Sequence, residues 1–131
     1  MREILFRGKK VSDNEWVYGC LVNNIYGASK PIIITDSDYD DNNCVNFDWD
    51  FVTPQTVGQF TGIYDKNGVK IFEGDIVRTD NGHIGYVIFR YGSFVKECSC
   101  HYKAFRVYGD NETVIGNIYD NPELLEQGES K

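Results

Sequence analysis

The residues most able to bind a transition metal lie in the tetrapeptide "CSCH", which contains Cys98, Cys100 and His101. Zinc takes four ligands, which sequences usually supply as two pairs with spacings such as CxxC or HxxxH. The CxC spacing is a less common half-site, and no matching second half stands elsewhere in the chain. Because alternate residues of a strand point the same way, Cys98 and Cys100 are more simply read as strand residues that pack or face solvent. We therefore expect no metal and no cofactor, with zinc binding by this group as the alternative.

Two acid-rich stretches raise the question of calcium binding, "DSDYDDNNCVNFDWD" at residues 36–50 and "YDKNGVKIFEGDIV" at residues 64–77. A calcium loop of the EF-hand type needs oxygen ligands at positions 1, 3 and 5, glycine at position 6 and a bidentate glutamate at position 12. The first stretch has Phe47 where the glutamate belongs, and the second has Lys70 where the glycine belongs. Neither stretch is therefore expected to bind calcium specifically.

Catalytic and phosphate-binding patterns are missing from the sequence. No GxxxxGK[ST] occurs, and no GxGxxG precedes a helical pattern. A nucleophilic mechanism needs a serine or cysteine with a nearby base and an orienting acid, but neither His83 nor His101 stands in a recognisable motif. We expect no catalytic residues and no enzyme, and a hydrolytic enzyme remains a residual third class.

The second acid-rich stretch is better explained by turns. Asn67-Gly68 is a strong hairpin signal, because a two-residue type I′ turn needs positive φ at both central residues. Such a loop predicts that Asp65 faces Lys70 across the hairpin. Asp80-Asn81-Gly82 contains a second Asn-Gly pair, and a two-residue loop there would place Thr79 opposite Ile84. The polar residues of this stretch therefore indicate folding rather than ligand binding.

Short runs rich in Val, Ile, Tyr and Phe recur between clusters of Gly, Asn and Asp, which is typical of a β protein. A strongly bent meander of about five short strands often closes into a small barrel. The run "YVIFRY", residues 86–91, is apolar on both faces, which predicts a central strand. The stretches expected to form strands are residues 3–7, 15–22, 30–35, 58–64, 74–79, 83–91, 102–108 and 113–119.

Two segments differ from this pattern. Residues 36–50 contain six Asp and no Lys or Arg, which predicts a long solvated loop between an N-terminal and a C-terminal β segment. At the other end, "NPELLEQ" predicts one short helix, with Asn121 as its cap and Pro122 at its first position. Residues 127–131 are expected to form a tail. With 131 residues, the chain has the length of one domain with a small appended piece.

Aromatic residues in or beside the expected strands are the main candidates for an interaction surface. Stacking platforms for bases or peptides are built from such side chains. The alternative is that these rings belong to the hydrophobic core, where most large apolar residues lie. The candidates are Trp16, Tyr18, Tyr86, Tyr91 and Phe94, with Phe89 beside them.

The charge balance disfavours nucleic acid as the partner. The chain has 20 Asp and Glu against 13 Lys and Arg, a formal net charge of -7, and no basic run longer than Lys9-Lys10. Nucleic-acid binding needs a clustered basic face, and only a local group such as Arg78, Arg90 and Lys96 could provide one. No signal peptide and no run of ~18 apolar residues is visible. We expect a cytoplasmic protein with reduced cysteines.

Several long motifs resemble one family. "MREILFRGK" and "EWVYGCL" stand at the start, "VTPQTVGQFTGIYDKNGVKIFEGDIV" in the middle and "VIGNIYDNPELL" near the end. Together they are similar to the YopX-like proteins, a group found mainly in phages and prophages of Gram-positive bacteria. Gln55 stands where Glu is usual in that group, and Phe60 where Tyr is usual. The resemblance implies a mostly-β protein with an SH3-like barrel after about residue 60, and it transfers no activity and no catalytic residue.

These observations predict a mainly β protein in two parts. Residues 1–59 form an N-terminal β segment with the acidic loop 36–50, and residues 60–126 form a bent meander that closes into a small SH3-like barrel and ends in the short C-terminal helix. The expected function is that of a non-enzymatic phage or prophage accessory protein that binds another protein. Direct nucleic-acid binding through an aromatic barrel face is the alternative. Exposed strand edges and the 86–91 strand also make a homo-oligomer plausible.

Overall fold

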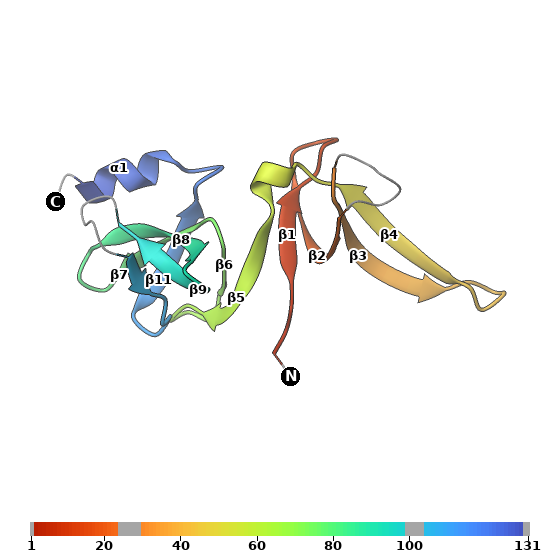
Figure 1. Cartoon of the computed structure of the whole chain (residues 1–131), viewed down its shortest axis with the longest axis horizontal. Helices are drawn as coiled ribbons and strands as arrows, with labels where there is room; N and C mark the ends of the chain where they lie inside the picture. The colour runs from red at the N-terminus through yellow and green to blue at the C-terminus, as the bar shows by residue number, and fades with distance from the viewer. Residues whose placement is uncertain (1, 24–29, 99–103, 130–131) are drawn as a thin grey trace. The chain divides into compact units, whose positions relative to one another are not determined.

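The computed structural model describes residues 2–23, 30–98 and 104–129. Its internal contacts divide the chain into two compact units, residues 1–59 and residues 60–131. Figure 1 shows strands throughout both units and a single labelled helix near the C-terminus. No helix among the described residues has the length and apolar content needed to cross a bilayer. Each unit is described separately below.

The first unit is an antiparallel sheet in the order β4-β3-β2-β1. The first two residues of β5 continue its pairing, with Gly58 opposite Arg7. Its buried apolar side chains among the described residues are Ile32, Ile33 and Val52, so the core of this unit is small. The elements are β1 (Phe6–Lys9), β2 (Trp16–Val22), β3 (Ile32–Tyr39), β4 (Val45–Phe51) and the 3₁₀ turn η2 (Pro54–Thr56).

The second unit contains a five-stranded antiparallel sheet in the order β10-β9-β8-β7-β11, with the β5–β6 hairpin beside it. Ile71, Val77, Val87 and Val107 form its buried core. Helix α1 packs against β8. The elements are β5 (Gly58–Tyr64), β6 (Lys70–Phe72), β7 (Asp75–Thr79), β8 (Ile84–Arg90), β9 (Ser93–Glu97), β10 (Ala104–Arg106), β11 (Glu112–Asn117) and α1 (Glu123–Glu129).

The structure confirms a mainly β protein with one short C-terminal helix among the described residues. It also confirms a central strand for residues 86–90 of the 86–91 run, because β8 has neighbours on both sides, while Tyr91 lies in the turn that follows. The helix runs on to Glu129, although a tail was expected from residue 127. No sheet of the described residues closes on itself, so the SH3-like barrel stays a prediction.

The predicted register of the β5–β6 hairpin is wrong by one residue. Tyr64 pairs with Lys70, and the N–H of Asp65 donates to the carbonyl of Val69 at 2.7 Å. Gly68 has a φ of 82°, whereas Asn67 is not among the residues with positive φ. The loop is therefore a type I turn followed by a glycine in the left-handed region, which takes three residues rather than two.

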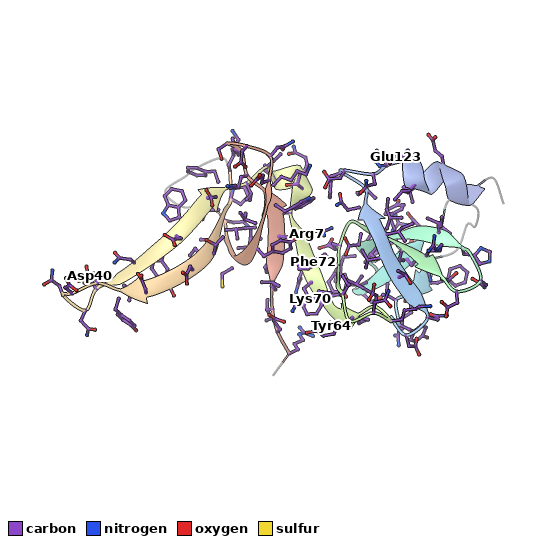
Figure 2. The ribbon with its side chains drawn as sticks, turned by 180° about the vertical axis from the view of Figure 1, so that it is seen from behind. Arg7, Asp40, Tyr64, Lys70, Phe72 and Glu123 are labelled. Carbon is purple, nitrogen blue, oxygen red and sulfur yellow. The ribbon has the colours of Figure 1, made fainter. Side chains whose placement is uncertain are left out.

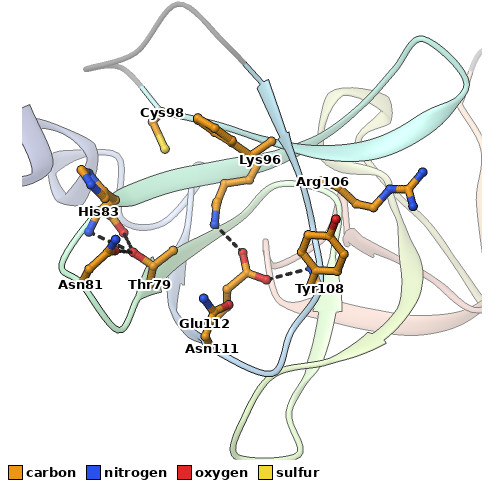
Figure 3. Close-up of a pocket in the computed structure, with 10 residues that line it drawn as sticks. Thr79, Asn81, His83, Lys96, Cys98, Arg106, Tyr108, Asn111 and Glu112 are labelled. Carbon is orange, nitrogen blue, oxygen red and sulfur yellow. Dashed lines mark hydrogen bonds and ion pairs between the residues drawn. The ribbon is translucent and has the colours of Figure 1, made fainter.

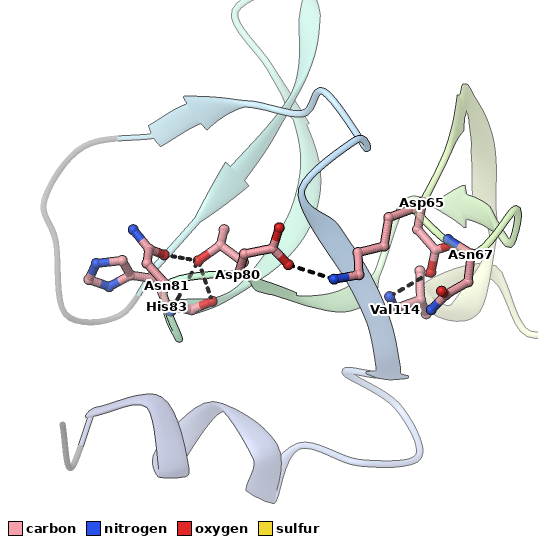
Figure 4. Close-up of polar contacts among 8 residues, drawn as sticks. Asp65, Asn67, Asp80, Asn81, His83 and Val114 are labelled. Carbon is pink, nitrogen blue, oxygen red and sulfur yellow. Dashed lines mark hydrogen bonds and ion pairs between the residues drawn. The ribbon is translucent and has the colours of Figure 1, made fainter.

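The side chain of Asp65 explains this choice of turn. One of its oxygens, Oδ1, accepts hydrogen bonds from the N–H groups of Asn67 at 2.8 Å and Val69 at 2.9 Å. An aspartate at the first position of a type I turn commonly bonds the backbone ahead of it in this way. The other oxygen, Oδ2, accepts from the N–H of Val114 in β11 at 2.9 Å, as Figure 4 shows. One carboxylate thus holds the turn and attaches it to the sheet.

The β7–β8 hairpin departs from its predicted register in the same way. Ile84 lies opposite Arg78, not opposite Thr79. Gly82 has a φ of 93°, its N–H donates to the carbonyl of Thr79 at 2.9 Å, and the N–H of Thr79 donates to His83 at 2.8 Å. A three-residue loop again replaces the expected two-residue one.

The acidic segment 36–50 is not the solvated loop that its composition predicts. Strand β3 continues to Tyr39 and β4 begins at Val45, so only residues 40–44 lie outside a strand. The carboxylate of Asp40 closes this turn, because it accepts hydrogen bonds from the N–H groups of Asn42 and Cys44, each at 2.9 Å. The apolar residues of β4 alternate with Asn and Asp, a period of two that indicates a strand. The high Asp content of the segment favours a loop, and the alternation in β4 that indicates a strand is therefore easily overlooked.

Candidate functional site

The β3–β4 hairpin exposes a largely apolar face, interrupted by Ser37 opposite Phe47. Residues opposite each other on paired strands point to the same side, and the register places Tyr39 opposite Val45 and Ile34 opposite Trp49. The apolar side chains of β3 and β4 that point to this side form what we call the hairpin face. Its five large exposed members are between 43% and 69% exposed: Tyr39, Val45, Phe47, Trp49 and Phe51.

Two of these rings already pack on each other. Trp49 and Phe51 make an edge-to-face contact, with ring centroids 5.2 Å apart and planes at 90°. Figure 2 shows Asp40 at the tip of this hairpin. Soluble monomers rarely expose a large contiguous apolar patch, and such patches commonly mark interaction sites. The hairpin face is therefore the strongest candidate for a binding surface in the first unit.

The opposite side of the same hairpin is acidic. Asp36 lies directly across from Asp48, and Asp38 lies across from Asn46. Like charges directly opposite on paired strands are destabilising. No Lys or Arg occurs between residues 31 and 65, so a cation for this surface would have to come from outside the segment. The hairpin thus combines aromatic side chains with a strongly negative flank.

Two of the predicted interaction residues, Trp16 and Tyr18, lie in β2 of the first unit. The guanidinium of Arg7 stands 4.6 Å from the ring centre of Trp16, and the ammonium of Lys9 stands 5.4 Å from it. Cations over an aromatic face stabilise the ring in place. Trp16 is therefore engaged within its own unit, whereas Tyr18 is about half exposed.

The other three predicted interaction residues lie in the second unit. The hydroxyl of Tyr86 donates to Glu97 Oε2 at 2.7 Å, and this hydrogen bond, together with burial, raises the pKa of Tyr86. Phe94 packs against the core of the unit and makes an edge-to-face contact with Phe89 at 5.1 Å. Tyr91 is 92% exposed at the turn between β8 and β9. The five predicted aromatics are thus divided between the two units, with two in the first and three in the second.

The basic group considered for nucleic-acid binding is not a free cationic patch. Lys96 is buried and its Nζ pairs with Glu112 Oε2 at 2.7 Å. Arg90 forms an ion pair with Glu97. Only Arg78, an exposed residue of β7, has no ion pair among those seen in the described part of the chain. This arrangement does not supply the clustered positive face that nucleic acid requires.

The structure bears only partly on the zinc hypothesis. Cys98 is a buried free thiol, while Cys100 and His101 lie outside the described residues. Within the described part of the chain, no group of three or more His, Cys, Asp or Glu side chains is arranged to hold a metal ion.

These features define a two-unit antiparallel β protein whose first unit presents an aromatic hairpin with an acidic flank. The sequence matches the model of the YopX protein family over residues 5–126, and the chain belongs to that family. Its fold is similar to the "Crystal structure of protein EF1440 from Enterococcus faecalis", with a TM-score of 0.66 and 26% sequence identity over 95% of this chain and 99% of that chain. A search of curated proteins found no match.

Proposed function

We propose that this protein is a non-enzymatic binding module whose hairpin face docks onto a basic protein. The observation that carries this proposal is the set of five large apolar side chains, each at least 43% exposed, on one side of a single hairpin. Aromatic residues dominate the binding energy of many protein interfaces. The hairpin face is rich in them, since four of its five large exposed members are aromatic.

The charge of the hairpin defines the chemistry of the partner. Six Asp lie between residues 36 and 50 of a chain whose net charge is -7. A complementary partner has an apolar cleft for Phe47 and Trp49 and Lys or Arg side chains around it, because charge complementarity selects partners and speeds their encounter. Nucleic-acid-binding proteins of the host would supply the basic side chains of such a surface.

The setting of this function is also a proposal. Family membership supports a phage or prophage accessory protein that acts in the cytoplasm of its bacterial host. For the second unit we propose the SH3-like barrel, supported by the packing of Ile71 from the β5–β6 hairpin against Val77 and Val87 of the five-stranded sheet. Self-association through exposed strand edges stays a prediction, and light scattering at two protein concentrations tests it.

The experiment compares wild type with the double variant Phe47→Ser/Trp49→Ser in affinity capture from host lysate. The matched control is Tyr91→Ser, which removes an even more exposed ring from the second unit. We expect wild type and the control to retain a basic protein from the lysate. The double variant should not retain it. Retention of that protein by the double variant would rule out the hairpin face. A gel shift on nucleic acid at micromolar protein that weakens with salt would favour the alternative partner.

A further inference from the structure

The second unit contains a cavity that the proposed docking function does not use. Its volume is about 350 Å³, and it is lined by the β7–β8 turn, by β9 and by residues 105–112, as Figure 3 shows. Sites for small molecules commonly have volumes of about 300–1,000 Å³. The cavity is therefore large enough for a small metabolite.

An ion pair lies at the wall of this cavity. Glu112, which is 1% exposed, holds the ammonium of Lys96 at 2.7 Å through Oε2. Its other oxygen accepts from the N–H groups of Tyr108 at 3.0 Å and Gly109 at 2.7 Å. Glu112 therefore orders the turn before β11, and its hydrogen bonds explain why a carboxylate stands there.

The hydrogen bonds of the turn before β11 involve Glu112 but not the ammonium of Lys96. An ammonium has three N–H groups, and within the described part of the chain Glu112 accepts one hydrogen bond from Lys96. The side chain of Lys96 is only 8% exposed and lines the cavity. The remaining N–H groups of Lys96 are therefore in position to donate to a molecule inside the cavity.

The neighbouring side chains add further donors. The hydroxyl of Thr79 donates to Asn81 Oδ1, which leaves the amide NH₂ of Asn81 to hydrogen-bond elsewhere. Asn111 and His83 line the same cavity. Together with the ammonium of Lys96, the amide groups of Asn81 and Asn111 give the cavity N–H donors that match a ligand rich in acceptors.

The charged residues that line the cavity also favour a ligand rich in hydrogen-bond acceptors. Glu112 is the single carboxylate among the described residues that line the cavity, against the two cations Lys96 and Arg106. A positive excess is unusual on a chain with a net charge of -7. Two exposed rings, Phe105 and Tyr108, also line the cavity and offer faces on which a planar group could stack.

We propose that this cavity binds a small molecule that carries an oxyanion, either a phosphate or a carboxylate, held by Lys96 and Asn81, with a planar group against Phe105 or Tyr108. Four probes separate these chemistries: inorganic phosphate, phenyl phosphate, acetate and benzoate. Each is titrated into the full-length, isotope-labelled protein at constant ionic strength, and amide chemical shifts are followed by NMR. The phosphate and carboxylate arms identify the oxyanion, and the added ring measures the stacking.

We expect saturable shifts at Asn81, His83, Asn111 and Lys96, and about tenfold tighter binding when the ring is present, the size of one stacking contact. The main variant is Lys96→Met/Glu112→Gln, which removes the cation without leaving a buried charge and keeps an oxygen for the turn. It should weaken binding at least tenfold, while Asn81→Ala should weaken it severalfold.

The matched control is Lys66→Met, which removes the same charge from an exposed lysine that pairs with Asp80 at 2.7 Å and does not line the cavity. It should leave the affinities unchanged. The proposal is overturned if no probe gives saturable shifts, or if a folded Lys96→Met/Glu112→Gln variant binds as tightly as wild type. An equal loss in the Lys66→Met control would also overturn it, because binding would then follow net charge. None of these results bears on the hairpin face.

Discussion

Replacing the carboxylate of Asp65 should destabilise the second unit more than its position in a surface turn implies. The residue is only 5% exposed, and its two oxygens accept three backbone hydrogen bonds of 2.8, 2.9 and 2.9 Å. Two come from its own turn and the third comes from Val114 in β11 (Figure 4). Its loss therefore releases both the turn and the attachment of the β5–β6 hairpin.

The magnitude follows from the hydrogen bonds. A hydrogen bond to a charged group contributes about 1.5–3 kcal/mol, and a buried donor left without a partner costs a similar amount. Asp65→Ala removes the two oxygens that accept these three hydrogen bonds, and water entering the small space offsets part of the loss, so we expect about 4 kcal/mol. Asp65→Asn keeps one oxygen but turns an NH₂ group toward an N–H, and we expect about 2–3 kcal/mol.

The pH dependence has a definite sign. Burial opposes ionisation of Asp65, but hydrogen bonds from Val114, Val69 and Asn67 outweigh it, and the pKa of the carboxyl group in the folded protein lies below its ordinary value. A depressed pKa contributes stability above the unfolded-state pKa of about 3.9, and this contribution is lost as the pH falls through the folded pKa. The difference between wild type and Asp65→Asn should therefore shrink as the pH falls below about 4.

Urea unfolding at pH 7 and at pH 2.5 to 4 measures these effects. Both tryptophans, Trp16 and Trp49, belong to the first unit, so their fluorescence serves as an internal reference, while amide signals of β7 to β11 report on the second unit. Asp110→Asn, at an exposed turn residue, is the matched control. The reasoning is refuted if Asp65→Asn unfolds within 0.5 kcal/mol of wild type at pH 7, roughly the spread of neutral surface substitutions, or if the difference does not change with pH.

Three further substitutions test the same unit. Gly68 has a φ of 82° with open space at its Cβ position, so Gly68→Val should cost more than about 1 kcal/mol through backbone strain alone and Gly68→Asn clearly less; equal melting temperatures would contradict the left-handed turn. Glu112→Gln should cost about 3 kcal/mol in urea unfolding because it leaves the buried Lys96 without its carboxylate, and adding Lys96→Met should restore part of that loss. Tyr86→Phe removes the hydrogen bond to Glu97 and should cost about 1 kcal/mol; a variant as stable as wild type would show that this bond adds nothing.

Much of the fold could be predicted where apolar runs are bounded by turn residues. Strand β5 covers residues 58–64 as expected, and β2 begins within one residue of its expected start. Both Asn-Gly sequences lie in turns, as the sequence predicts. The register of the two hairpins does not follow from the sequence, because the choice between a two-residue and a three-residue loop depends on the hydrogen bonds of Asp65 and Thr79. Those bonds form only in the folded hairpin.

The candidate site was less predictable than the fold. The composition of residues 36–50 predicts exposure to solvent, and all of them except the half-buried Asp50 are exposed. The alternation of apolar and acidic residues in β4 is the signal that could have shown a strand. The donor-rich cavity could not be predicted, since Asn81, Lys96 and Glu112 are separated by 15 or more residues and meet only through strand pairing.

The most direct test of the docking surface is site-specific photo-crosslinking in the bacterial host. A photoreactive phenylalanine analogue replaces Phe47 on the hairpin face, and the same group at Tyr91 serves as the control. The account predicts a single major adduct at position 47 to a protein with a basic surface, lost when Trp49→Ser is added and not formed from position 91. Identical adducts from both positions, or an adduct to nucleic acid at position 47, would contradict it.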